Sequence, residues 1–83
     1  MRQEGESMKR NMIMDRTWME RARREKGFTQ EQVADAAHIT TAGYNRIENG
    51  LFTPGVVTAI LICDKLGVSP RQFLTERPVG HAK

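Results

Sequence analysis

The sequence predicts an all-α domain, a compact bundle of five short helices. Three observations lead to this fold class. Apolar residues recur three or four positions apart in several segments. Residues of the kinds that start and end helices separate these segments. No segment shows the alternation of apolar and polar residues that is typical of a strand. We expect the domain over residues 15–75, between a flexible N-terminal arm (residues 1–14) and a flexible C-terminal tail (residues 76–83).

Size and composition limit the kind of protein. The 83 residues suffice for one domain with a modest core, so a large catalytic cavity is not expected. Hydrophobic residues make up 39% and charged residues 28%, which is the balance of a globular domain. No apolar run approaches the roughly 18 residues of a membrane span, and the N-terminus lacks the pattern of a signal peptide. We therefore expect a cytoplasmic protein with no membrane partner.

The residues that commonly bind metals are sparse. Cys63 is the single cysteine and lies within an apolar run, so its expected role is that of a small core residue. His38 and His81 are far apart in the sequence, and neither has a Cys, Asp or Glu at the spacing of metal ligands. We expect neither a metal site nor a cofactor.

The positive charge is concentrated at one end of the chain. Residues 1–26 hold eight basic and five acidic residues, which accounts for the whole net charge of +3. The remaining residues are neutral in sum. This balance suits an anionic partner without identifying one.

The first two helices have clear boundaries. The first is expected over residues 15–26, with Gly27 as its C-cap glycine. Its inward face is formed by Trp18, Met19 and Ala22. The second begins after Thr29, a good N-cap, and Gln32 stands three positions later, which is the spacing of a capping box. Its inward face is formed by Val33, Ala34 and Ala37.

The third helix has one polar face that looks outward. Thr40 is its expected N-cap, and the helix runs over residues 41–49 and stops at Gly50. Tyr44 and Ile47 are three positions apart and point inward. The outward positions are Ala42, Asn45, Arg46 and Asn49. Such a face is suited to contact a partner.

The last two helices each begin with a cap followed by a proline. Thr53 is the expected cap of the fourth helix and Pro54 its first residue; Ser69 and Pro70 repeat this pattern for the fifth. The fourth helix ends at Gly67. Its expected inward stripe consists of Val56, Ala59, Ile60, Cys63 and Leu66. The brief fifth helix is expected to be anchored by Phe73 and Leu74.

Two continuous stretches resemble a known family. They are "RREKGFTQEQVADAAHITTAGYNRIENG" and "TPGVVTAILICDKLGVSPRQFL". Both look like the lambda-repressor-like, Xre/Cro-type helix-turn-helix proteins of bacteria and phages, over about residues 15–74. The pieces "TQEQVA", "RIENG" and "LGVSP" occur in the family's order and separation. The resemblance implies that the second and third helices form a helix-turn-helix.

The resemblance also implies roles for individual residues. Base edges of DNA would be contacted by Thr41, Ala42, Asn45 and Arg46. Phosphates would be contacted by Gln30, Thr40, Gly43 and Asn49. Arg23 and Glu48 would form a structural ion pair between the first and third helices. Arg24 and Lys26 are either phosphate contacts or ordinary surface charges.

The chemistry of the third helix agrees with base reading. Arginine pairs with guanine and asparagine with adenine through two hydrogen bonds each, and one such pair discriminates by about 1–3 kcal/mol. Arg46 and Asn45 have these side chains, whereas the small Thr41 and Ala42 suit thymine methyl groups. The alternative for Asn45 and Arg46 is a solvated helix face.

Two positions depart from the family pattern within the helix-turn-helix. His38 stands in the turn where the family often has glycine, so either His38 adopts a left-handed conformation or the turn differs. Gly43 lies inside the recognition helix, where glycine costs about 0.5–1 kcal/mol relative to alanine. Close approach of the backbone to DNA is one explanation, and a chance substitution is the other.

The fourth helix and the loop before it carry surplus apolar residues. These are Leu51, Phe52, Val57 and Leu61. A patch of this kind usually marks a partner surface, so we predict a homodimer that uses it. The alternative is that these residues extend the core.

Together these features predict a sequence-specific regulator that binds double-stranded DNA. We expect a transcriptional repressor that acts as a homodimer on a two-fold operator. The alternatives are an antitoxin of a toxin–antitoxin pair and a protein-interaction module that has kept the fold without reading DNA. In both alternatives a protein partner would bind through the terminal segments or the apolar patch. We do not expect an enzyme, because no nucleophile with an adjacent base and no phosphate-binding glycine loop is present in the sequence.

Overall fold

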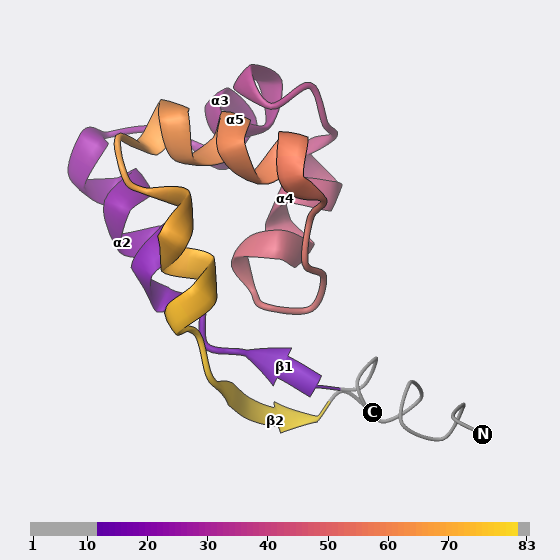
Figure 1. Ribbon diagram of the computed structural model, residues 1–83. Helices are drawn as coiled ribbons and strands as arrows, with labels where there is room; N and C mark the ends of the chain where they lie inside the picture. The colour runs from indigo at the N-terminus through magenta and orange to yellow at the C-terminus, as the bar shows by residue number, and fades with distance from the viewer. Residues whose placement is uncertain (1–11, 82–83) are drawn as a thin grey trace.

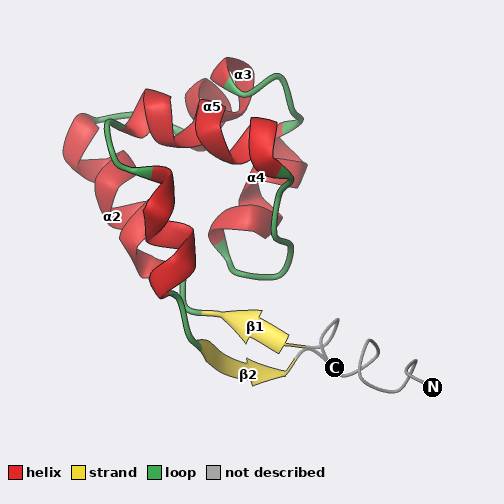
Figure 2. Cartoon of the chain, viewed as in Figure 1, coloured by secondary structure: helices red, strands yellow, loops and turns green. Residues whose placement is uncertain are grey.

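Five helices form most of the domain, as the sequence predicts. The computed structural model describes residues 12–81. Figures 1 and 2 show the helices packed into one body, with a two-stranded sheet lying beside it. The elements in chain order are β1 (Met12–Met14), α2 (Thr17–Lys26), α3 (Gln30–Ala36), α4 (Thr41–Glu48), α5 (Val56–Leu66), the 3₁₀-helix η1 (Pro70–Thr75) and β2 (Pro78–His81). None of the helices in this part of the chain is long and apolar enough to cross a bilayer.

The core lies where α2, α3, α4 and α5 meet. The inward faces expected for the first three helices are confirmed, with Trp18 packed against the core rather than fully buried. Cys63 is buried, as expected of a core residue. The buried apolar side chains are Met19, Ala22, Val33, Ala34, Ala37, Tyr44, Ile47, Ile62, Cys63 and Leu66.

Most helix ends follow the local sequence. The Thr29 hydroxyl accepts a hydrogen bond from the Gln32 backbone N–H, and the Gln32 side-chain oxygen accepts one from the Thr29 backbone N–H, which completes the capping box. Thr40 caps α4 through the N–H of Gly43. Gly27 and Gly67 end their helices with φ angles of 77° and 73°, which glycine adopts without steric strain.

The start of α5 differs from the prediction. The helix begins at Val56 with Gly55 as N-cap, rather than at Pro54 with Thr53 as cap. The Thr53 hydroxyl instead accepts a hydrogen bond from Arg16, 3.2 Å away. The Thr53 hydroxyl, which the local sequence pattern assigned to the helix cap, therefore forms a tertiary hydrogen bond with Arg16 instead.

The inward stripe of α5 is also partly wrong. Val56 and Ile60 are 75% and 42% exposed, whereas Ile62 is fully buried. The segment "VVTAILIC" is apolar on nearly every side, so its periodicity does not select one face. Leu61 packs against the core, which corrects its assignment to a surface patch.

In η1, Phe73 is the anchor and Leu74 is not. Phe73 packs against Trp18 with ring centroids 5.1 Å apart in an edge-to-face arrangement. Leu74 is 77% exposed, which corrects the prediction that it anchors this helix. Ser69 caps η1 and Pro70 begins it, as expected.

Two short strands extend the domain beyond its expected limits. β1 and β2 pair antiparallel, with Met12 opposite His81 and Ile13 opposite Gly80. The structure thus places residues from both expected flexible segments in a sheet, and Figure 1 shows the strands side by side below the helices. Strands of three and four residues are too short to show alternation. The rest of the expected arm, residues 1–11, lies outside the described residues, as do residues 82–83.

Gly50 joins the end of α4 to β1. The Met14 N–H donates to the Gly50 carbonyl at 3.1 Å. Gly50 has a φ of 79°, and a Cβ at this position would overlap the Met14 carbonyl. Glycine is therefore required here both by the left-handed backbone and by the close approach of β1.

A buried arginine connects the two ends of the domain. The side chain of Arg16 is fully buried, and its guanidinium lies 5.1 Å from the centroid of the Phe73 ring. It pairs with Glu76 at 2.8 Å. Its remaining hydrogen bonds go to the carbonyls of Ile47 (3.0 Å) and Phe52 (2.8 Å) and to the Thr53 hydroxyl (3.2 Å).

Glu76 completes this connection from the C-terminal side. Its side chain is 2% exposed, and its carboxylate accepts hydrogen bonds from Arg16 and from the Trp18 indole N–H at 2.7 Å. A buried charge is stable only when it is paired and hydrogen-bonded, and both conditions are met here. Glu76, which lies within the expected flexible tail, is therefore part of the interior.

Replacing Glu76 should destabilise the domain strongly. We expect Glu76→Ala to lower the free energy of unfolding by about 3–5 kcal/mol, because the buried Arg16 would lose its counter-charge. Urea denaturation at pH 7 measures the change. The control is Glu20→Ala, which breaks an exposed ion pair with Arg24 and should cost less than about 0.5 kcal/mol. Equal effects of the two substitutions would contradict this account.

Candidate nucleic-acid interface

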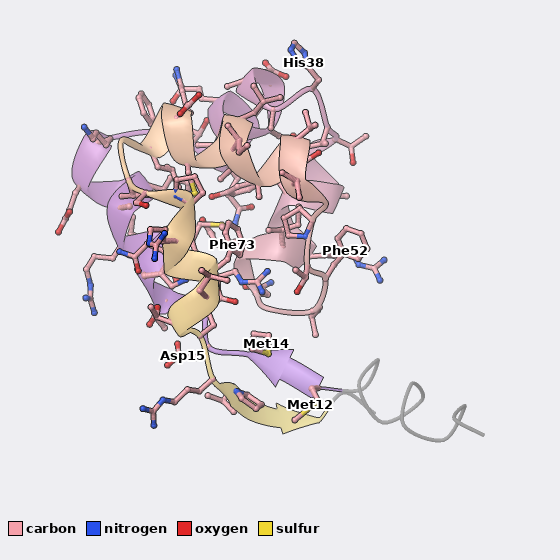
Figure 3. All side chains as sticks on the ribbon, in the orientation of Figure 1. Met12, Met14, Asp15, His38, Phe52 and Phe73 are labelled. Atoms are coloured by element: carbon pink, nitrogen blue, oxygen red, sulfur yellow. The ribbon has the colours of Figure 1, made fainter. Side chains whose placement is uncertain are left out.

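The turn between α3 and α4 is closed by backbone hydrogen bonds and one left-handed residue. His38 has a φ of 61°, so of the two possibilities that the sequence left open it is the left-handed conformation that occurs. The Ile39 N–H donates to the Ala34 carbonyl at 3.0 Å, which brings the chain back toward α3. A left-handed conformation costs a non-glycine residue about 1–2 kcal/mol. Figure 3 shows the His38 side chain at the outer edge of this turn.

Helix α4 presents its polar face to solvent. Tyr44 is fully buried and Ile47 is 2% exposed, so these two residues fix the rotation of the helix about its axis. All the positions expected to contact bases are exposed, namely Thr41, Ala42, Asn45 and Arg46. Asn49 and Thr40 are exposed as well, while Gly43 is half-buried. One surface therefore carries most of the expected DNA-contacting residues.

The amide side chains on this surface are hydrogen-bonded to one another. Asn45 donates from Nδ2 to Gln30 Oε1 at 3.2 Å. Asn49 donates from Nδ2 to Asn45 Oδ1, also at 3.2 Å. The structure thus brings Gln30 of α3 next to two expected contact residues of α4.

The Gln30 amide is in turn oriented by a buried carboxylate. Gln30 donates from Nε2 to Glu48 Oε1 at 2.7 Å, so its Oε1 is turned toward Asn45. Glu48 also accepts from the Tyr44 hydroxyl at 2.9 Å. The expected ion pair with Arg23 is present, with 2.7 Å between Arg23 Nε and Glu48 Oε2. One carboxylate therefore joins α2, α3 and α4.

Arg46 differs from two arginines of α2. Arg23 is paired with Glu48, and Arg24 forms an exposed ion pair with Glu20 at 2.8 Å. Within residues 12–81 the Arg46 guanidinium makes no ion pair. Together with Gly43 and Phe52 it lines a hollow of about 290 Å³ on the outer side of α4.

The apolar residues expected at a dimer interface do not form one patch. Leu51, Phe52 and Val57 are exposed, but Leu61 packs against the core. Phe52, in the loop before α5, lies beside Gly43 and Arg46 rather than with the exposed apolar residues of α5. A separate apolar groove of about 320 Å³ runs between α5 and η1 and is lined by Thr53, Pro54, Val56, Ala59, Ile60, Pro70 and Phe73. The sequence analysis placed Val56 and Ile60 in the core, because the periodicity of the almost wholly apolar α5 does not select one face.

A family model described as helix-turn-helix matches residues 19–73. The match covers α3, α4 and α5 in full and most of α2 and η1. This chain belongs to the helix-turn-helix family. It is of the Xre/Cro type, its fold is that of a lambda-repressor-like DNA-binding domain, and the family consists of transcriptional regulators rather than enzymes.

Known helix-turn-helix proteins resemble the chain in sequence and in structure. A protein of Bacillus subtilis (strain 168), the "Uncharacterized HTH-type transcriptional regulator YqaF", is 52% identical over 54 residues, which is 65% of this chain and 71% of that protein. The N-terminal DNA binding domain of SinR from Bacillus subtilis superimposes with a TM-score of 0.63 at 26% identity, covering 74% of this chain and 90% of that domain. The restriction-modification controller protein C.AhdI from Aeromonas hydrophila has the same fold, with a TM-score of 0.59 at 22% identity over 65% of this chain and 82% of that one.

Burial and hydrogen bonding change the pKa of three groups in the helices. Burial alone raises the pKa of Glu48, but hydrogen bonds from Arg23, Gln30 and Tyr44 outweigh it and hold this pKa below its usual value. Burial, followed by the nearby Glu48 charge, raises the pKa of Tyr44, so its hydroxyl remains a donor. Burial raises the pKa of Cys63 to about 11, which keeps the thiol neutral.

Among residues 12–81, no three His, Cys, Asp or Glu side chains are grouped to bind a metal.

Removing the Glu48 charge should weaken the domain in a pH-dependent way. The folded-state pKa of Glu48 lies below its ordinary value of 4.5, so its stabilisation is present above that pH and is lost as pH falls through the lowered pKa. At pH 7 we expect Glu48→Gln to reduce the free energy of unfolding by about 3 kcal/mol. Chemical denaturation between pH 7 and pH 3 should show the difference from wild type narrowing toward the acid end. A difference that stays constant over this range would contradict the assignment.

Proposed function

We propose that this protein is a transcriptional repressor that binds a two-fold DNA operator as a homodimer. The observation that carries the proposal is the exposed face of α4, where an oriented Asn45 amide adjoins Arg46, whose guanidinium forms no ion pair within residues 12–81. Helix α4 would lie in the major groove, as recognition helices do in helix-turn-helix proteins. Occupying promoter DNA would then exclude other proteins from it.

Base reading would depend on the side chains of Arg46 and Asn45. The Arg46 fork matches the O6 and N7 acceptors of guanine. The Asn45 amide uses one N–H and one oxygen lone pair within the protein, which leaves one donor and one acceptor for adenine. Thr41 and Ala42, small and exposed, would contact thymine methyl groups.

The phosphate contacts would come from the edges of the same surface. Gln30 donates one Nε2 hydrogen to Glu48, and its second Nε2 hydrogen would donate to a phosphate oxygen. Thr40, Gly43 and Asn49 flank α4 and would lie close to the same backbone. Residues 27–83 have no net charge, so we expect a modest salt dependence of binding.

Dimerisation would use the exposed apolar surface at the start of α5. Leu51, Val56, Val57 and Ile60 are between 42% and 75% exposed, which leaves several large side chains in water. A second copy would cover them by a two-fold contact, so that residues of one subunit meet the same residues of the other. Such a dimer would present two copies of α4 to successive major grooves.

The same apolar surface favours a second function. A protein-interaction module would use the groove between α5 and η1 to bind another protein, and an antitoxin would bind its toxin in this way. In that case Asn45 and Arg46 would have no role in binding, and this difference separates the hypotheses.

Selection of duplexes from a random pool tests operator reading. We expect an enriched inverted repeat at moderate salt, because specific sites retain binding that non-specific backbone contacts lose. On the enriched duplex, Arg46→Ala and Asn45→Ala should each weaken binding by about 1–3 kcal/mol and relax the preference at one base pair per half-site. The control is Arg24→Ala, which removes an exposed charge on α2 and should leave base preference intact. Absence of any enriched duplex would favour the protein-interaction module.

Sedimentation tests the dimer. We expect wild type to sediment as a dimer at micromolar concentration and Val57→Glu to sediment as a monomer, because a charge would be buried without a partner. Val79→Glu is the matched control, since Val79 is similarly exposed, 63% against 71%, but lies on β2. If both variants keep the wild-type mass, the α5 surface is not the interface.

A further inference from the structure

An aromatic ring stands beside the expected base-reading residues, although it lies outside the recognition helix. The hollow of about 290 Å³ on the outer side of α4 is lined by Gly43, Arg46 and Phe52. Phe52 is 55% exposed. Figure 3 shows it on the outer side of the loop after α4, on the opposite side of the molecule from Asp15. The base-reading roles assigned above make no use of this ring.

The backbone of Phe52 is fixed relative to α4. Its carbonyl accepts a hydrogen bond from the buried Arg16 guanidinium at 2.8 Å. The preceding residue, Leu51, donates its N–H to the Arg46 carbonyl at 2.9 Å. Arg16 also donates to the Ile47 carbonyl of α4, so both contacts fix the loop backbone relative to that helix, and less backbone entropy is lost when the ring meets a ligand.

Gly43 lines the hollow without a side chain. A Cβ at this position would lie 3.1 Å from the Thr40 hydroxyl oxygen that caps α4. Apart from that oxygen and the two chain neighbours of Gly43, no side-chain atom of the described residues lies within 4 Å of such a Cβ, and the glycine leaves bare backbone as one wall of the hollow. The glycine, which weakens a helix relative to alanine, therefore has a structural consequence on the outer surface.

The walls of the hollow indicate what it binds. One wall is an aromatic ring, one is bare glycine backbone, and the third is Arg46, a cation with no acidic partner among the described residues. The cation favours the polyanion DNA over an apolar protein surface. In the major groove, the apolar group that distinguishes one base from the others is the C5 methyl of thymine.

Resting on the DNA-binding function proposed above, we propose that Phe52 is a further specificity-determining residue. Its ring and the Gly43 backbone hold the C5 methyl of a thymine next to the base pair that Arg46 reads. This assignment removes Phe52 from the dimer surface. It agrees with the lining of the α5 groove, which includes Thr53 and Pro54 but not Phe52.

Replacing thymine by deoxyuridine tests this proposal, because the two bases differ only by the methyl group. The probe is the duplex enriched from the random pool, with each thymine replaced in turn, and affinity is measured by fluorescence anisotropy. For wild type we expect at least one thymine per half-site, next to the base pair that Arg46 reads, at which removal of the methyl weakens binding about fourfold, the value of one buried methyl group. For Phe52→Ala the same replacement should change the affinity by less than about 1.5-fold, because the methyl's partner is absent.

Leu74→Ala is the matched control, since Leu74 is an exposed apolar residue, 77% exposed, that neither lines the hollow nor belongs to the proposed dimer surface. It should keep the fourfold methyl effect. The proposal is overturned if Phe52→Ala keeps that effect, or if no thymine shows it in wild type. It is equally overturned if Phe52→Ala weakens all duplexes alike and sediments as a monomer, which would place the ring at the subunit interface.

Different results would overturn the operator-reading function and the role of Phe52 in it. Wild-type protein that enriches no duplex overturns the operator-reading function and the role of Phe52 with it. Normal enrichment without a methyl effect coupled to Phe52 overturns only the role of the ring. Thermal unfolding of Phe52→Ala, monitored by circular dichroism, should match wild type within a few degrees because the ring is more than half exposed.

Discussion

The buried Glu48 carboxylate determines how the helices of this domain meet. It accepts hydrogen bonds from Arg23 of α2, Gln30 of α3 and Tyr44 of its own helix. A carboxylate is stable in the interior only when such partners are in place, so three helices must converge on one point. The angle between α3 and α4 follows from this requirement together with the left-handed turn at His38. The same interaction sets the direction of the amide groups on the surface.

A buried residue, Glu48, therefore sets the orientation of the amide side chains on the outer face of α4. Glu48 takes the N–H of Gln30, so the Gln30 oxygen faces Asn45, and Asn45 in turn accepts from Asn49. These amides are oriented before any ligand arrives, which reduces the entropy lost on binding. The buried Arg16 donates to the Phe52 carbonyl and so fixes the backbone that carries the ring beside Arg46. Each buried charge thus supports one part of the proposed DNA-contacting surface.

The two proposed binding surfaces lie on different elements. The α4 surface combines amides, Arg46 and the Phe52 ring, whereas the start of α5 exposes aliphatic side chains and borders an apolar groove. This separation would let a dimer form without covering the recognition helix. The small sheet of β1 and β2 contacts the end of α4 through Gly50. The ends of the described chain are thereby tied to the helix-turn-helix unit.

The sequence by itself determined the features that depend on residues close together in the chain. These include the capping box at Thr29, the cap at Thr40, the family motifs and the buried side of α4. Only the tertiary structure decided which side of the almost wholly apolar α5 faces the core, and it left Val56 and Ile60 exposed. It also decided the pairing of β1 with β2 and the contact of Arg16 with Glu76, 60 residues away. The spacing of apolar residues cannot predict such distant partners, because it depends only on residues within a turn or two of helix.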